Sequence, residues 1–129
     1  MRKKQAEHNE GLCKILYKNG KYNDWVLTTA FYSALHYVQH KIFMSHFEWN
    51  KKKYKAFELY FKDFSRNHPT IGKHSATLSL VYEKIPIIYA KYRWLKDECH
   101  TARYKNYNIS DSYAELSMKY LEEIKIECM

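Results

Sequence analysis

Turn-forming residues are scarce in this chain of 129 residues, which contains three glycines and two prolines. The scarcity, together with many helix-compatible residues, favours long helices joined by short connections. The chain also lacks internal repeats and any linker rich in serine, proline or glycine. Because its length suits one modest core but not two, we predict a single all-α domain over residues 1–129.

Cysteine pairs and long apolar runs are missing as well. Cys13, Cys99 and Cys128 are odd in number and far apart, without a CxxC pair, which argues against a disulfide framework and against a zinc ribbon. No apolar run approaches the roughly 20 residues that span a bilayer. No apolar segment follows the charged start MRKKQAEHNEG as it would in a signal peptide. These absences lead us to expect a cytoplasmic protein with reduced thiols and no membrane partner.

Several signatures of cofactor and metal enzymes are also absent. The chain has no Walker loop, no Rossmann glycine fingerprint and no nucleophile elbow. His36 and His40 stand four residues apart, a spacing that can hold a metal on one helix face. However, no glutamate follows His36 as in HExxH, and no third ligand is adjacent in sequence. We predict that His36 is a hydrogen-bonded core or rim histidine, and we expect neither a metal nor an organic cofactor.

Positive charge and aromatic rings are what the sequence has in excess. The formal net charge is +8, and 13 tyrosines lead an aromatic content of 17%. Such a charge favours anionic partners such as nucleic acid. The basic run Lys51, Lys52, Lys53 and Lys55 encloses Tyr54, so it can track a phosphate backbone beside a stacking ring. The alternative interpretation of this run is a solvated helix end.

Hydrophobic periodicity predicts where the first helices lie. A helix over residues 5–18 ends at the stop signal Asn19-Gly20. The next, over 24–44, is apolar around much of its circumference and should be central in the fold. Residues 51–64 predict an amphipathic helix that packs its aromatic residues on the body.

The second half of the chain predicts three more helices. One begins near Gly72, carries His74 on its inner face and is broken by Pro86. Its successor has the most regular apolar seam in the chain. The seam consists of Ile88, Tyr92, Leu95, Cys99 and Ala102. Ser112 and Glu115 stand at capping-box spacing and predict the start of the last helix. The pattern therefore predicts five or six helices in an antiparallel bundle.

One face of the helix with the apolar seam carries polar groups in a column. Arg93, Asp97, His100 and Tyr104 recur at spacings of four, three and four residues, which keeps nearly the same direction on a helix. An arginine can grip a phosphate with two hydrogen bonds, and a histidine moves protons near neutral pH. With the RNA 2′-hydroxyl as nucleophile, this pair can cleave RNA without a metal if both groups face one open groove. The alternative is an ordinary surface ion pair between Arg93 and Asp97.

Three segments resemble one protein family. The order DWVLTTAFYSALHYVQHKI, HPTIGKHS and YAKYRWLKDECHTARY is similar to the HEPN superfamily, the higher eukaryote and prokaryote nucleotide-binding domain. That family has an aspartate-tryptophan helix start, a central helix with F/Y-Y-x-A-L-H-Y-V, a short S/P-H segment and a late helix ending in A-R-Y. The resemblance covers most of the chain, and residues 50–65 look like an insertion relative to the shortest members.

The resemblance implies a four-helix core, a symmetric homodimer and, in active members, metal-independent endoribonuclease activity. In those members four to six residues separate an arginine from a histidine, and six residues separate Arg93 from His100. The pair would then be catalytic, with Asp97 orienting one of its members. In a second register Arg103 takes the place of the histidine and Glu98 that of the arginine, which implies an inactive, partner-binding branch.

His36, His74 and Arg103 also match the family pattern, and with Tyr104 they predict a second polar site. Arg103 joins the lysine run as a predicted nucleic-acid contact.

Our first hypothesis is a homodimer that acts on RNA as a ribonuclease of toxin or host-defence type. If it is a toxin, an antitoxin is its expected protein partner. A second hypothesis is a non-catalytic adaptor that docks a larger nucleic-acid enzyme, such as a nucleotidyltransferase, a reverse transcriptase or a CRISPR-type effector. A third is a basic protein that binds RNA or DNA without chemistry.

Overall fold

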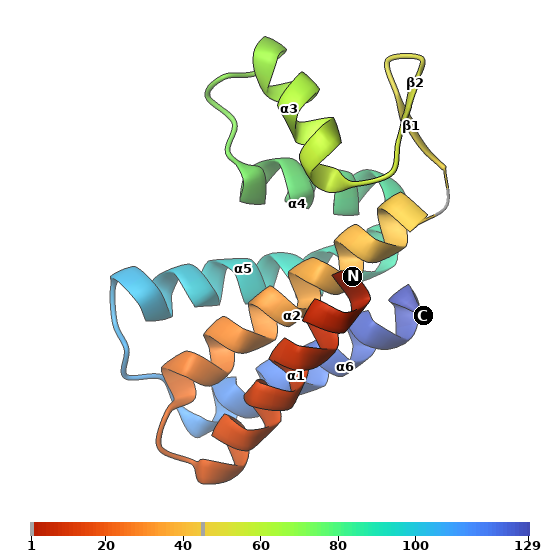
Figure 1. The fold of residues 1–129 in the computed structure, drawn as a ribbon. Coiled ribbons are helices and arrows are strands. Elements are labelled where there is room, and N and C mark those ends of the chain that lie inside the picture. Colours follow the sequence, from red (N-terminus) through yellow and green to blue (C-terminus); the bar gives the residue numbers. More distant parts are fainter. Residues whose placement is uncertain (1, 45) are drawn as a thin grey trace.

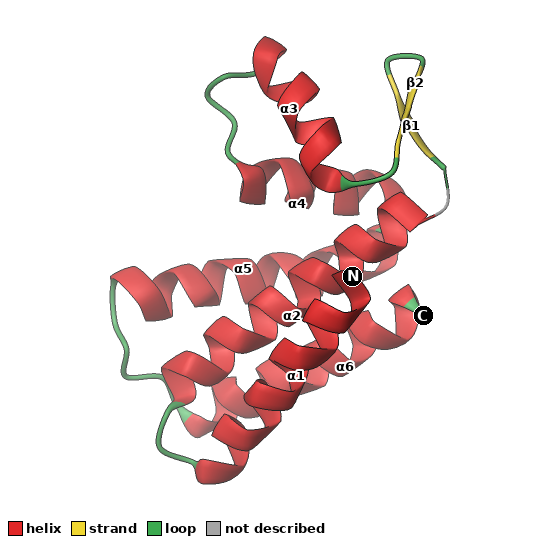
Figure 2. Ribbon diagram, in the orientation of Figure 1, coloured by secondary structure: helices red, strands yellow, loops and turns green. Residues whose placement is uncertain are grey.

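Helices account for most of the residues that the computed structural model describes, which are 2–44 and 46–129 (Figure 1). The six α-helices of these ranges are α1 (Arg2–Asn19), α2 (Asn23–Met44), α3 (Phe57–Asn67), α4 (Lys73–Lys84), α5 (Tyr89–Tyr104) and α6 (Asp111–Cys128). A 3-10 turn, η1 (Pro86–Ile88), precedes α5, and two short strands, β1 (Phe47–Trp49) and β2 (Lys52–Tyr54), pair antiparallel (Figure 2). The prediction of an all-α bundle is confirmed. None of the helices in these ranges is both long and apolar enough to cross a membrane.

Helix α2 is the centre of the bundle, as predicted, and contacts α1, α4, α5 and α6. One apolar stripe of this helix is buried throughout and consists of Leu27, Phe31, Ala34, Val38 and Ile42. The helix is apolar around its circumference because it has neighbours on several sides, whereas a helix with one buried face would need only one stripe. Trp25 lies in its first turn and is 46% exposed, so the bundle leaves that end uncovered.

A buried carboxylate ties three helices together. Glu10 of α1 is only 4% exposed and accepts a hydrogen bond of 2.6 Å from the hydroxyl of Tyr37 on α2. Its second oxygen lies 3.3 Å from the amine of Lys125 on α6 and 3.2 Å from that of Lys14. A charge inside a core is tolerated only when such partners replace its water.

The apolar seam of α5 is confirmed, since Ile88, Tyr92, Leu95, Cys99 and Ala102 are all buried. Pro86 separates α4 from α5 as predicted and stands in the first turn of η1. The last helix starts in the predicted segment SDSYAEL, but the predicted capping residue is wrong. Ser110, not Ser112, caps α6, because its hydroxyl accepts the amide hydrogen of Tyr113.

The predicted helix over 51–64 begins only at Phe57, and a hairpin occupies the residues before it. Asn50 and Lys51 form its two-residue turn with φ values of 54° and 66°, the left-handed geometry that suits the twist of paired strands. The lysine run therefore lies on this turn, on β2 and, at Lys55, on the bend that follows β2, rather than on a helix. The two strands have three residues each, too few for alternation to stand out against the helical spacing of the aromatic residues.

These aromatic residues extend the hydrophobic core of the bundle towards the hairpin and α3. This aromatic cluster comprises Phe43, Phe47, Trp49, Tyr54, Phe57, Tyr60 and Phe64. Within it the rings of Phe43 and Phe47 have centroids 4.6 Å apart, and those of Phe47 and Tyr60 are 5.1 Å apart. Phe43 is at the end of α2, so the cluster fastens the hairpin and α3 to the central helix. An ion pair between Arg2 and Glu58 adds a link from α1 to α3.

Candidate functional site

A pocket of about 240 Å³ lies where the start of α4, the C-terminal half of α5 and α2 meet. We call it the α4–α5 pocket. It is lined by Phe31, Tyr32, Gly72, Lys73, His74, Ser75, Lys96, Cys99, His100, Arg103 and Tyr104. Three of these side chains are cationic, two are imidazoles and, among the described residues that line it, none is acidic. An anionic ligand is therefore the class that this lining favours.

The first turn of α4 forms one wall of the α4–α5 pocket. The chain turns at His68 and Ile71, joined by a backbone hydrogen bond of 3.2 Å, and Gly72 is the N-cap. Gly72 has no side chain to accept the first amide hydrogens of the helix. These amides and the positive end of the helix dipole therefore add to the attraction for an anion.

His74 stands on the wall formed by α4. Its ring packs edge-on against Phe31 and Tyr32, with centroids 5.3 Å and 5.9 Å away. Partial burial, and then the charges of Lys96 and Lys73, lower the pKa of His74. Its imidazole is therefore more readily neutral near pH 7 than a free histidine.

The prediction that His74 faces inward is wrong in one respect, because the residue is exposed at the pocket rim. Ala76 and Thr77 supply the first buried positions of α4 instead. His74 belongs to the first turn of α4, where one side of its ring contacts Phe31 and Tyr32 and the rest of the residue faces solvent.

The last turns of α5 form the opposite wall of the α4–α5 pocket. The ring of His100 lies 5.0 Å from that of Tyr104. The guanidinium carbon of Arg103 lies 5.4 Å from the ring centroid of Trp25 and 5.9 Å from that of Tyr104. These cation–π contacts hold Arg103 in place and leave its N–H groups available for a ligand.

Cys99 and Tyr32 form the floor of the pocket, and neither side chain acts as a nucleophile. Cys99 is buried, and its burial raises the pKa of the thiol. Burial likewise raises the pKa of Tyr32, against a lowering by the charge of Arg103. Both groups therefore stay protonated near neutral pH.

The polar column on α5 divides between two sites. Arg93 pairs loosely with Asp97 at 3.7 Å, and each side chain is 60% exposed. Both border a second hollow, lined by Tyr89, Ala90, Arg93, Trp94 and Asp97. We expected Arg93 and His100 to face one groove, whereas His100 borders the α4–α5 pocket.

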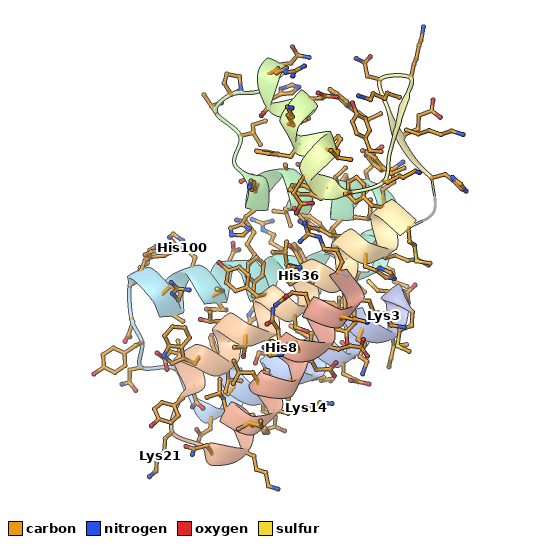
Figure 3. The ribbon with its side chains drawn as sticks, in the orientation of Figure 1. Lys3, His8, Lys14, Lys21, His36 and His100 are labelled. Atoms are coloured by element: carbon orange, nitrogen blue, oxygen red, sulfur yellow. The ribbon has the colours of Figure 1, made fainter. Side chains whose placement is uncertain are left out.

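The predicted second polar site is brought together in part. His74, Arg103 and Tyr104 share the α4–α5 pocket, whereas the Nδ1 of His36 accepts a hydrogen bond of 3.0 Å from the guanidinium of Arg2. Burial and the charge of Arg2 lower the pKa of His36, which suits the hydrogen-bonded histidine that we expected. Figure 3 shows His36 on α2 and His100 towards the end of α5, well apart.

The lysine run lies away from the pocket, on the hairpin beside the aromatic cluster. Lys52 pairs with Asp63 of α3 at 3.3 Å, while Lys51, Lys53 and Lys55 are exposed. Within residues 2–44 and 46–129, no three histidine, cysteine, aspartate or glutamate side chains lie together in a way that could hold a metal ion.

Sequence reasoning missed Lys73, Ser75 and Lys96 as members of the site. The signal for the first two was the segment GKHS, since a glycine N-cap followed by polar residues marks a helix start that can bind an anion. Lys96 carried no comparable signal.

Comparison of the chain with protein-family models, curated protein sequences and solved structures finds no significant match.

Proposed function

We propose that this chain acts on RNA at the α4–α5 pocket and cleaves a phosphodiester there by metal-independent acid–base chemistry. The observation that carries the proposal is the meeting of two imidazoles and three cationic side chains, without an acidic neighbour among the described residues, in one pocket. A phosphate needs positive groups around it, and RNA cleavage needs a base and an acid near neutral pH. The resemblance to HEPN ribonucleases points in the same direction.

The chemistry assigns a separate role to each side chain. His74, whose pKa is lowered, takes the proton of the 2′-hydroxyl as that oxygen attacks the phosphorus. His100 gives a proton to the leaving 5′-oxygen, which produces a 2′,3′-cyclic phosphate and a 5′-hydroxyl. Arg103 stabilises the charge that develops on the phosphoryl oxygens in the transition state.

The size of the pocket favours a polymer over a whole small molecule. Its volume of about 240 Å³ lies below the roughly 300–1,000 Å³ of sites that enclose drug-sized ligands. One phosphate with its sugar can enter while the rest of the strand stays outside. The net charge of +8 and the exposed lysines of the hairpin provide attraction for that remainder.

Incubation of the purified chain with single-stranded RNA in EDTA tests the proposal. Cleavage should occur, and His74→Ala and His100→Ala should each reduce its rate by about 100-fold or more, the usual contribution of one acid or base. His8→Ala is the matched control, because His8 is an exposed histidine on α1 (Figure 3). Absence of cleavage by the wild type, or equal rates in all variants, would refute the catalytic role.

A non-catalytic adaptor is the second candidate function. It is favoured by a larger hollow of about 600 Å³ between the end of α2, β1, η1 and α6, with the exposed Ile87 at its border. Such a mixed apolar and charged surface suits a protein partner. A pull-down from the native host that returns RNA and no protein partner would count against this candidate.

A further inference from the structure

A second hollow lies next to the α4–α5 pocket on the same helix, and it has a different chemistry. Its volume is about 290 Å³, and its lining combines the rings of Tyr89 and Trp94 with the polar pair Arg93 and Asp97. Flat rings beside hydrogen-bonding groups are what a nucleobase needs, since its faces stack and its edge pairs.

The aromatic walls of this hollow are held in place by other rings. Trp94 packs edge-on against Tyr113 and Tyr120, with centroids 5.5 Å and 5.3 Å away. Tyr89 packs edge-on against Tyr82 at 5.1 Å. A base that stacks here therefore meets rings that are already ordered, which limits the entropy lost on binding.

The polar pair of the hollow can read one base. Arg93 and Asp97 approach only to 3.7 Å and are each 60% exposed, so the carboxylate and the guanidinium both keep hydrogen-bonding capacity for a ligand. A carboxylate is a fork of acceptors, and guanine is the RNA base that offers it two adjacent donors, N1–H and the N2 amino group. The guanine O6 is then left as an acceptor for the guanidinium.

The spacing along α5 fits a strand that occupies both sites. Lys96 borders the α4–α5 pocket, and Asp97, which borders the hollow, points about 100° further around the helix. From Arg93 to His100 is seven residues, about 10 Å along a helix axis. A single strand covers such a distance in a few nucleotides, so a phosphate in the pocket leaves a nearby base within reach of the hollow.

We propose that the hollow at Arg93, Trp94 and Asp97 is a guanine-selective nucleobase subsite beside the phosphate pocket. This inference rests on the proposed function, because it assigns the base preference of the RNA that the α4–α5 pocket takes. It gives Arg93 and Asp97 a role in recognition in place of the catalytic role expected from sequence.

The test uses fluorescein-labelled, 2′-O-methylated pentanucleotides, which lack the attacking hydroxyl and stay intact. Anisotropy titrations compare UUGUU with UUAUU, UUCUU and UUUUU. The wild type should bind UUGUU about tenfold more tightly than the others, within the discrimination of one good bidentate contact. Asp97→Asn should abolish that preference and leave the affinity for UUUUU within about twofold, because stacking and phosphate contacts remain.

Glu115→Gln, which neutralises an exposed carboxylate on α6, is the matched control and should keep the preference. Equal affinity of the wild type for all four oligomers, or a preference that survives Asp97→Asn, would overturn the guanine subsite. If Lys73→Ala then weakens all four equally, the RNA function still stands. Failure of every oligomer to bind the wild type would overturn both proposals.

Discussion

Replacing Tyr37 by phenylalanine should lower the free energy of unfolding by about 1.5–3 kcal/mol, the usual contribution of a hydrogen bond to a charged group. The lost bond is the one of 2.6 Å to the buried Glu10, and the phenyl ring keeps the packing. Lys14→Ala removes a different contact of Glu10, the one with the amine of Lys14 one turn further along α1. The side chain of Lys14 is 58% exposed. Its loss should lower the stability by only about 0.3–0.5 kcal/mol.

The Glu10 carboxylate also predicts a pH dependence. Burial alone would raise its pKa, but hydrogen bonds from Tyr37, Lys14 and Lys125 outweigh burial and lower it. The folded value therefore lies below the unfolded one of about 4.3. The stabilisation by ionised Glu10 is complete above the unfolded pKa and is lost as the pH falls through the folded pKa. Glu10→Gln should thus be less stable than the wild type at pH 7, and the difference should narrow below about pH 4.

Urea denaturation followed by far-ultraviolet circular dichroism measures both effects, with Lys14→Ala as the matched control for Tyr37→Phe. The reasoning fails if Lys14→Ala destabilises the protein as much as Tyr37→Phe. It fails equally if the difference between Glu10→Gln and the wild type is the same at pH 7 and at pH 3.

Two further predictions concern a buried hydroxyl and the hairpin. The hydroxyl of Tyr92 is buried and has no hydrogen-bond partner within the described ranges. Because Tyr92→Phe removes this unpaired polar group, it should raise the free energy of unfolding by about 1–2 kcal/mol. A urea midpoint below that of the wild type would contradict this prediction. Lys51→Glu combined with Lys53→Glu should weaken RNA binding for all sequences alike and reduce the dependence of log K on log salt, since each phosphate contact contributes roughly one unit of slope. Lys21→Glu, in the turn after α1, is the control, and equal salt slopes for both variants would exclude the hairpin from the RNA path.

The helices of the bundle could be predicted from sequence because their packing follows one regular period. The stripe of α2 from Leu27 to Ile42 and the seam of α5 from Ile88 to Ala102 are both buried, and each repeats every three or four residues. The hairpin could not be predicted in this way. Its strands are short, and its fold depends on Asn50 and Lys51 adopting a left-handed turn, for which the composition gives little warning.

Some residues of the candidate site could be predicted from sequence, but their grouping could be predicted only in part. His74, His100, Arg103 and Tyr104 were all singled out, and they line one pocket. Which of these side chains meet depends on how α4 packs against α5. Hydrophobic periodicity describes each helix separately and does not predict how two helices pack. The sequence therefore predicted that Arg93 shares a groove with His100, whereas in the structure Arg93 lines the second hollow with the rings of Tyr89 and Trp94.

The five residues His68 to Gly72 connect α3 directly to the first turn of α4. The aromatic cluster joins α3 to the hairpin and also to Phe43 of α2. Because the connection to α4 is so short, the position of the first turn of α4, and with it that of the backbone amides beside His74, depends on where the cluster holds α3. Rings of the hairpin such as Phe47 therefore help to define the geometry of a pocket that they do not line.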